Sequence, residues 1–446
     1  MQSSSGGPAR GTSWQWDEET DGGGATEDVI AGGGERTGPS RRRLLLGAGA
    51  LAAGGAAWAL GRSGGDGARP SPGPTEPLPT ALSGPTPLWT YRGPEAMTPE
   101  RLTDPPHRPV FLSKSGLQVL DHAKGTPGRL LVFDPPADRN WPNDLDTLGK
   151  VVFGPDHLFT TYQGHVEARH FTDPAADWSL PLPDELQGRT RLAGYDRRDP
   201  AVLYGCAWGR PRVDGSLSDN YLFALRVTDH KLLWSVRTEQ AEQLVTPTAD
   251  GGGAGRLAGV RFLDGRAELV VRDAATGREL WTATGEEDLR WFVSDSSGFF
   301  VPDGNGGVRV LRSTGELSWT YSPARGESRR ALPPIQHGPR VYIPWDQGVV
   351  TCHDSSSGAE LWSCRLPFPL DRRSRPLVAN GTLFVPGTSV GGVSAIYPAT
   401  GELGWTFHDS GPGKDVWTLA TDATHQYDGT RLYAGHDDVL HALPLN

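Results

Sequence analysis

The sequence predicts an all-β protein, a propeller of eight four-stranded blades, on three observations. A tryptophan-ended unit recurs along the chain, most clearly in four stretches that end at Trp281, Trp319, Trp362 and Trp405. The steps from Trp234 to Trp405 are 47, 38, 43 and 43 residues, which is the length of a four-stranded blade. The 59 glycines and 38 prolines favour many short strands joined by turns over long helices.

Each unit combines an apolar strand, a turn that ends in glycine, and a strand that carries the tryptophan. Residues 268–271, 308–311 and 349–352 are apolar or alternate apolar and polar, as buried and half-buried strands do. Gly277 and Gly358 stand where a hairpin turn needs a positive φ. Another strand pair precedes these two, so we expect four strands per unit.

Tryptophan recurs for a physical reason. A twisted sheet cannot bury both of its faces alone, and an indole supplies a large apolar surface together with an N–H that can reach a nearby carbonyl. The repeat tryptophans are therefore interpreted as structural: Trp89, Trp178, Trp234, Trp281, Trp319, Trp362 and Trp405. A degenerate unit at residues 117–132, with Val132 in the tryptophan position, brings the number of units to eight.

The two ends of the predicted propeller complement each other. Leu88-Trp89 arrives without preceding strands, and Val439–Leu443 ends the chain without a tryptophan strand after it. We expect these segments to pair in one blade, which closes the ring and removes the exposed edges of an open sheet. The predicted domain covers residues 88–446, and we expect it to be a monomeric ring.

The residues before this domain have another character. Residues 1–40 are rich in glycine, serine and acidic residues and are predicted to be a disordered acidic tail. Residues 41–61 begin with three arginines followed by an apolar run, which resembles a twin-arginine export signal or a signal anchor. Residues 62–87 are a Pro/Gly-rich linker. We expect the domain to be extracytoplasmic, either secreted or anchored to the membrane with the N-terminus inside.

The net charge of the chain limits the classes of partner that it can bind. The formal net charge is −10, which argues against nucleic-acid binding.

Of the three cysteines, Cys352 and Cys364 lie on neighbouring strands of one predicted hairpin, where the cysteines of an exported protein could be oxidised to a disulfide. A four-residue turn would place Cys352 opposite Leu361 and leave Cys364 three places out of register, so two independent thiols are favoured.

The unit AATGRELW, which ends at Trp281, resembles the pyrroloquinoline-quinone-type propeller repeat. That family includes quinone-dependent dehydrogenases and the outer-membrane assembly propeller lipoprotein, so the resemblance implies the fold and, for some members only, the quinone cofactor. The dehydrogenases have an adjacent cysteine pair beside the quinone, and this chain has none. No clustered acidic loop for calcium and no CxxCH haem motif is present. The sequence therefore assigns no catalytic, cofactor-binding or metal-binding residue.

A basic cluster is the main candidate for a binding site. Two consecutive loops that join one unit to the next are rich in arginine, and neighbouring blades would bring them to one sector of the rim. Arginine suits carboxylate or phosphate groups on a partner, although a solvated surface is the competing interpretation. The candidate residues are Arg325, Arg329, Arg330, Arg372, Arg373 and Arg375. Trp291 and Trp417 stand in comparable loops and are expected either to line the opening or to pack beneath it.

The sequence thus predicts a non-enzymatic, exported or membrane-tethered propeller that binds a protein or a cell-surface polymer. The first alternative is a sensor that binds a small anionic ligand in the axial pocket. The second is a quinone-dependent dehydrogenase, which the missing cysteine pair opposes.

Overall fold

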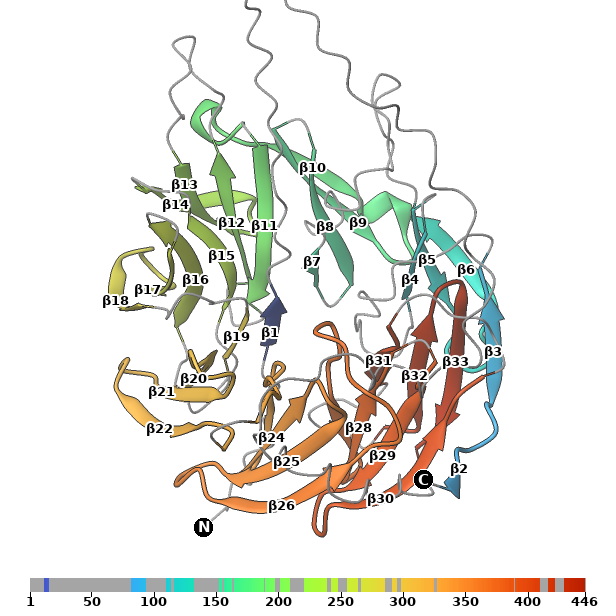
Figure 1. The fold of residues 1–446 in the computed structure, drawn as a ribbon. Coiled ribbons are helices and arrows are strands. Elements are labelled where there is room, and N and C mark those ends of the chain that lie inside the picture. Colours follow the sequence, from blue (N-terminus) through green and yellow to red (C-terminus); the bar gives the residue numbers. More distant parts are fainter. Residues whose placement is uncertain are drawn as a thin grey trace, which may run out of the picture. The chain divides into compact units, whose positions relative to one another are not determined.

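The computed structural model is an all-β protein whose described strands pair antiparallel, apart from the two-residue strand β2 (Leu82–Ser83) (Figure 1). No helix among them is long and apolar enough to cross a membrane. The structure describes residues 12–15, 82–93, 110–113, 116–131, 152–154, 156–162, 164–187, 189–196, 201–208, 220–238, 242–247, 255–263, 266–284, 291–294, 298–324, 327–388, 390–409, 416–421 and 429–445. The predicted signal, residues 41–61, lies outside these ranges.

The described strands form eight sheets. In chain order, the first four are β4–β6 (Val110–Ser113, Gly116–Leu120, Pro127–Leu131), β7–β10 (Val152–Phe153, His157–Tyr162, His165–His170, Trp178–Pro181), β11–β14 (Arg189–Asp196, Val202–Trp208, Asn220–Arg226, Lys231–Thr238) and β15–β18 (Glu242–Pro247, Arg256–Leu263, Arg266–Asp273, Glu279–Thr284). The next three are β19–β22 (Trp291–Ser294, Gly298–Pro302, Val308–Arg312, Leu317–Tyr321), β23–β26 (Ile335–His337, Arg340–Trp345, Val349–Asp354, Glu360–Arg365) and β27–β30 (Leu377–Ala379, Thr382–Pro386, Val393–Tyr397, Glu402–Phe407). The eighth joins β3 (Trp89–Arg92) to β31–β33 (Thr418–Thr421, Arg431–His436, Val439–Pro444). Two 3-10 helices, η3 (Pro174–Ala176) and η4 (Asp184–Leu186), flank β10.

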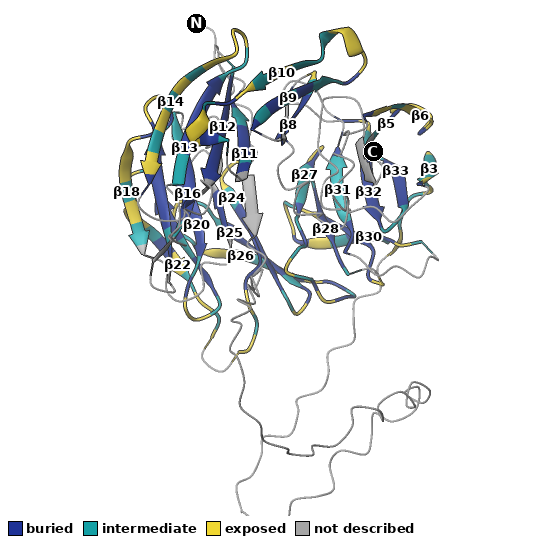
Figure 2. Cartoon of the chain, turned by 90° about the horizontal axis from the view of Figure 1, so that it is seen from above, coloured by how far each residue is buried: buried dark blue, intermediate teal, exposed yellow. Residues whose placement is uncertain are grey.

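Burial differs between the third and fourth strands of a sheet. Four consecutive residues of β13 are buried, whereas β14 alternates between exposed and partly buried residues (Figure 2). The buried run Leu222–Leu225 of β13 is apolar because both faces of the strand are covered there, and β14 alternates because only one of its faces packs on protein. The fourth strand of a sheet is therefore the one that meets solvent.

Neighbouring sheets share their cores. Phe159 of β8 packs in one cluster with Phe223 of β13, and Phe300 of β20 packs in another with Ile343 of β24. Leu120 of β5 joins a cluster with residues of β32 and β33. Burial of one such side chain contributes about 1.5–3 kcal/mol, so these cores are the main cohesion between sheets.

The repeat tryptophans fasten each sheet to the next one. The indole N–H of Trp281 donates to the carbonyl of Ser313, 3.0 Å away in the turn between β21 and β22. The ring lies against Gly315 of that turn, whose φ is +90°. Trp234, Trp319 and Trp362 make the same N–H contact with the carbonyls of Ala274, Ser355 and Pro398. Trp89 does so with the carbonyl of His122 in the β5–β6 turn. Each of these five rings thus bonds to a turn of a neighbouring sheet, which is the contact that the structural interpretation calls for.

Arg129 takes the tryptophan's place in the β4–β6 sheet. It follows the positive-φ Gly125 by four residues, as Trp281 follows Gly277. The register pairs Gln118 with Leu130 and, past a bulge, Leu120 with Pro127, which leaves Arg129 beside Val119. The expectation that Val132 holds this position is therefore wrong, because Arg129 occupies it four residues after the turn glycine; Val132 itself lies outside the described residues.

The side chain of Arg129 reaches the following sheet as an indole would. One Nη donates to the carbonyl of His170, and the other lies 3.2 Å from Oδ2 of Asp177. A guanidinium therefore joins the β4–β6 sheet to the β7–β10 sheet where the other units use an apolar ring.

The two ends of the domain pair as expected. β3 runs antiparallel to β33, with Trp89 opposite Ala442 and Arg92 opposite Val439, and Figure 1 shows the two strands side by side. Leu88 N–H donates to the carbonyl of Ala442 at 2.7 Å. The guanidinium of Arg92 lies 3.1 Å from the carboxylate of Asp438.

Two strands lie in segments that were predicted to be irregular. β1 (Thr12–Gln15) falls in the tail and pairs with β19, and β2 (Leu82–Ser83) falls in the linker and pairs with β30 in parallel. The structure places these six residues in strands, and the disordered tail and extended linker stay predictions for the rest of those segments. Each strand joins the edge strand of a sheet, whose backbone groups offer a template for pairing. The rest of residues 1–40 lies outside the described ranges.

All three cysteines are buried free thiols. Cys352 stands opposite Trp362, and Cys364 stands opposite Val350, because a bulge separates Cys352 from His353. The two thiols are therefore two places out of register, one fewer than predicted. Burial raises the pKa of Cys352 and of Cys364 to about 11, so both thiols stay protonated near neutral pH.

Candidate functional site

The predicted arginine cluster belongs to the loops that follow β22 and β26. Arg325 lies outside the described residues. In the first loop Arg330 is exposed and Arg329 is partly buried. In the second loop Arg372 is exposed, whereas Arg373 and Arg375 are partly buried.

Both loops attach to one residue, Asp346, in the turn between β24 and β25. Its carboxylate accepts from the backbone N–H of Arg330 at 3.0 Å, and its own N–H donates to the Arg330 carbonyl at 3.0 Å. Its carbonyl accepts from the N–H of Leu370 at 3.0 Å, at the start of the second loop. One turn thus fixes both arginine-bearing loops, and we call Arg330, Arg372 and Asp346 with their loops the arginine edge.

Arg329 is held by the protein itself. Its guanidinium lies 4.5 Å from the centre of the Trp345 ring, a cation–π contact. Its Nε is 2.8 Å from Glu327, and one Nη donates to the hydroxyl of Tyr321 at 3.3 Å. Burial, with a hydrogen bond to Glu360, raises the pKa of Tyr321 to about 12, which keeps that hydroxyl protonated. Arg329 therefore has a structural role.

The second loop holds two of its arginines in a similar way. Nε of Arg373 lies 3.3 Å from the carboxylate of Asp371. Arg375 donates to the carbonyl of Arg372 at 2.9 Å and to that of Ser374 at 3.3 Å. The exposed arginines of the cluster among the described residues are Arg330 and Arg372.

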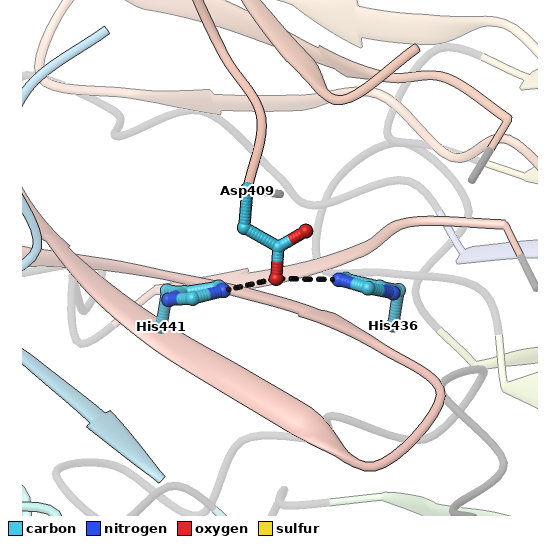
Figure 3. Close-up of side chains that lie close together, drawn as sticks. All are labelled: Asp409, His436 and His441. Atoms are coloured by element: carbon cyan, nitrogen blue, oxygen red, sulfur yellow. Dashed lines mark hydrogen bonds and ion pairs between the residues drawn. The ribbon is translucent and has the colours of Figure 1, made fainter. Parts of the chain in front are cut away.

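A second site, which sequence reasoning missed, lies in the sheet that joins the two ends of the domain. Oδ2 of Asp409 lies 3.0 Å from Nε2 of His436 and 3.1 Å from Nε2 of His441 (Figure 3). His436 is on β32, His441 is on β33, and Asp409 comes from the loop after β30. The three ligand-type atoms lie within 4.8 Å of one another. We call these three residues the His–Asp cluster.

Strand register explains why the two rings meet. Ala434 is opposite His441 in the β32–β33 pair, so His436 is its diagonal neighbour on the same face of the sheet. The five-residue separation of His436 and His441 was a usable signal once a hairpin was expected there. Asp409 could not be found in this way, because it lies in a loop that follows a strand of a different sheet.

The cluster is enclosed by aromatic rings. Trp417 is fully buried and lies 4.2 Å from the ring of His436 and 5.9 Å from that of His441, between ring centres. Phe407 contacts His441 edge to face at 5.1 Å. Of the two outcomes expected for Trp417, the structure shows the packed one; the side chain of Trp291 lies outside the described part.

The outer nitrogens of the two histidines also have partners. Nδ1 of His436 is 3.0 Å from the carboxylate of Asp437, and Nδ1 of His441 is 2.9 Å from the hydroxyl of Thr90 on β3. Burial lowers the pKa of His441, and the hydrogen bond and negative charge of Asp409 oppose that shift. Burial therefore favours the neutral imidazole, the form that can bind a metal.

Comparison with protein families matches residues 304–444 to the model of outer membrane protein assembly factor BamB. This stretch carries pyrroloquinoline-quinone-like propeller repeats. The match contains both described arginine loops and all three residues of the His–Asp cluster. No curated protein matches the chain.

Solved structures resemble the fold. The computationally designed Ika8 protein has 13% identity and a TM-score of 0.52, and the match covers 80% of this chain and 99% of that one. Sqt1 of Saccharomyces cerevisiae has 12% identity and a TM-score of 0.52, with 82% and 100% covered. BamB of Moraxella catarrhalis has 17% identity and a TM-score of 0.47, with 67% and 86% covered. At these identities the first two likenesses concern the fold alone.

Proposed function

We propose that the eight sheets are the blades of one closed propeller. Three contacts support closure: β3 pairs with β33, Leu120 of β5 packs against the β31–β33 sheet, and Arg129 bonds to the β7–β10 sheet. The β4–β6 sheet thereby contacts the sheets on both sides of it. In a closed ring each sheet would pack between two neighbouring sheets, so neither of its faces would be left open to solvent.

We further propose that this propeller is a non-enzymatic scaffold, exported or tethered to a membrane, that binds an acidic segment of a protein. The matched family model describes an assembly factor for outer membrane proteins, which favours a protein partner over a surface polymer. The apolar segment at residues 41–61, with its arginines, supports export. The linker would give the domain reach from the membrane.

The observation that carries the binding proposal is the attachment of both arginine loops to Asp346. This turn sets Arg330 and Arg372 on rigid supports, so less conformational entropy is lost when a carboxylate binds. The arginine edge carries positive charge, whereas the chain as a whole has a net charge of −10. An acidic segment would therefore be attracted to the arginine edge and repelled by the rest of the surface.

The test is capture of partners from native membranes with the tagged full-length chain and with Arg330→Ser/Arg372→Ser. Arg329 is kept because it stacks on Trp345, and its loss would perturb the fold. The matched control is Arg312→Ser, which removes an exposed arginine 3.8 Å from Glu316 in a turn of the β19–β22 sheet. We expect the double variant to lose partners that wild type and the control retain. Equal recovery by all three would refute the proposal.

The small-ligand alternative makes a different prediction. A sensor for an anionic molecule would gain thermal stability from a soluble ligand such as citrate or inorganic phosphate. A scaffold would respond only to the macromolecular partner. Melting curves across a panel of small anions therefore distinguish the two functions.

A further inference from the structure

The His–Asp cluster combines features of a divalent metal centre. Two imidazole nitrogens and one carboxylate oxygen are the ligand types that Zn²⁺ and its neighbours prefer, whereas Ca²⁺ and Mg²⁺ prefer oxygen ligands alone. His436 and His441 are buried, and Asp409 is 16% exposed, so the donors converge at a nearly enclosed point. Three protein ligands would leave a fourth position for water.

The distances fit such an ion. Zinc bonds of 2.0–2.2 Å in tetrahedral geometry separate neighbouring ligand atoms by about 3.3–3.6 Å. The Asp409 oxygen already lies 3.0 and 3.1 Å from the two nitrogens. The three ligand-type atoms are at most 4.8 Å apart, so a small rotation of the side chains would suffice.

The surrounding hydrogen bonds fit as well. A histidine that binds metal through Nε2 commonly donates its Nδ1–H to a carboxylate or another acceptor, which fixes the ring. Asp437 is placed to accept from His436, and the Thr90 hydroxyl is placed to accept from His441.

We propose that the His–Asp cluster binds a divalent transition metal of the zinc type, and that the ion strengthens the sheet in which the two ends of the domain pair. Asp409 would connect the β27–β30 sheet to the ion, and His436 and His441 would connect two C-terminal strands. Thr90 carries the connection to β3, because its hydroxyl holds the ring of His441. The ion would thus join two sheets directly and, through the hydrogen bond of His441 to Thr90, link them to a strand 351 positions away in the chain.

Direct binding is the first test. Full-length protein stripped with EDTA is titrated with Zn²⁺ by calorimetry and with Co²⁺ by visible absorption. We expect one ion per chain, and an affinity at least about 100-fold weaker for Asp409→Asn and for His441→Gln. Thr90→Val, which changes only the outer hydrogen bond, should weaken binding by about 10- to 100-fold.

His157→Gln is the matched control. The ring of His157 also lies next to a second histidine, His170, at 4.9 Å between ring centres. Its nitrogens face Asp156 and the carbonyl of Ala176 rather than a shared ligand point. This variant should bind zinc as wild type does. Absence of stoichiometric binding by wild type, or equal affinity in Asp409→Asn and wild type, would overturn the proposal.

A second measurement does not depend on any variant that folds poorly. Zinc should slow amide hydrogen exchange of wild type at Trp89–Arg92 and Val439–Pro444, and leave exchange in the β15–β18 sheet unchanged. Equal exchange with and without zinc at β3 and β33 would contradict the claim that the ion strengthens this sheet. Neither measurement involves the arginine edge, so the two proposals can fail separately.

Discussion

The indole N–H of Trp319 donates to the carbonyl of Ser355 at 2.9 Å, across the boundary between two sheets. The ring faces Gly358 of the same turn, and a Cβ added to that glycine would lie 2.7 Å from Cδ2 of the indole. The turn and the ring therefore fit only while the turn residue has no side chain. The same relationship recurs at Trp234, Trp281 and Trp362.

Gly358→Ala should destabilise the fold through both backbone strain and collision. Gly358 has a φ of +74°, which costs an L-residue about 1–2 kcal/mol. Displacement of the Trp319 ring should add about 1–3 kcal/mol. Gly381→Ala is the control, since its φ is +67° and a Cβ there meets nothing within 4 Å. Urea unfolding should show a larger loss for Gly358→Ala; equal losses would mean that the ring has room to move.

The pair Arg272–Glu242 should behave as a buried unit. Arg272 binds both oxygens of Glu242 at 2.7 and 2.6 Å, and their side chains are 6% and 0% exposed. Arg272 also donates to the carbonyl of Gly277, in the turn that receives Trp234. Arg272→Met alone leaves a buried carboxylate without its partner and should cost about 3–5 kcal/mol.

The double variant Arg272→Met/Glu242→Gln provides the comparison. It removes both charges, so it should recover much of the stability that the single variant loses. Urea unfolding of wild type, Arg272→Met, Glu242→Gln and the double variant gives the coupling free energy between the two side chains. Additive losses would show that the two side chains act independently.

Asp354 should make the stability of one turn depend on pH. Hydrogen bonds from Ser356 and Ser357 lower its pKa from 3.8 to about 2. A lowered pKa in the folded state stabilises the fold above the unfolded-state value, and this stabilisation is lost as the pH falls from about 4 towards 2. Thermal melts of wild type and Asp354→Asn should differ at pH 7 and converge near pH 2. Ser356→Ala/Ser357→Ala should reduce the same pH dependence, and parallel curves for all variants would exclude this cause.

The cysteines should be unreactive in the folded protein. Burial protects all three thiols and raises the pKa of Cys352 and Cys364 to about 11. Iodoacetamide at pH 8 should leave native protein unmodified and, without reductant, label three thiols per chain after denaturation. Labelling of only one thiol in denatured protein would indicate a disulfide between two of them.

Local rules predicted the repeat correctly. A glycine four residues before the tryptophan sets both the turn and the point where the ring leaves the strand, and each is readable from a single unit. The same spacing, Asp121, Gly125 and Arg129, would have found the guanidinium that replaces an indole. Reliance on the apolar character of Val132 obscured that spacing.

Contacts between sheets were harder to predict from the sequence. Asp409 meets His436 only because two sheets pack together, and no local pattern encodes that approach. The sequence offered Arg329 as a candidate binding residue, because its stacking on Trp345 depends on the path of a loop without periodicity. The pairing of Trp89 with the C-terminal strand was predictable because both segments lacked partners of their own.

The hydrogen bond between Thr90 and His441 joins residues 351 positions apart. During synthesis, β3 is made several hundred residues before its neighbour β33 exists. Such a long separation makes this step slow relative to formation of each local hairpin. A chain without β33 would lack both the β32–β33 hairpin and the neighbour of β3, and the edge strands left exposed would favour self-association.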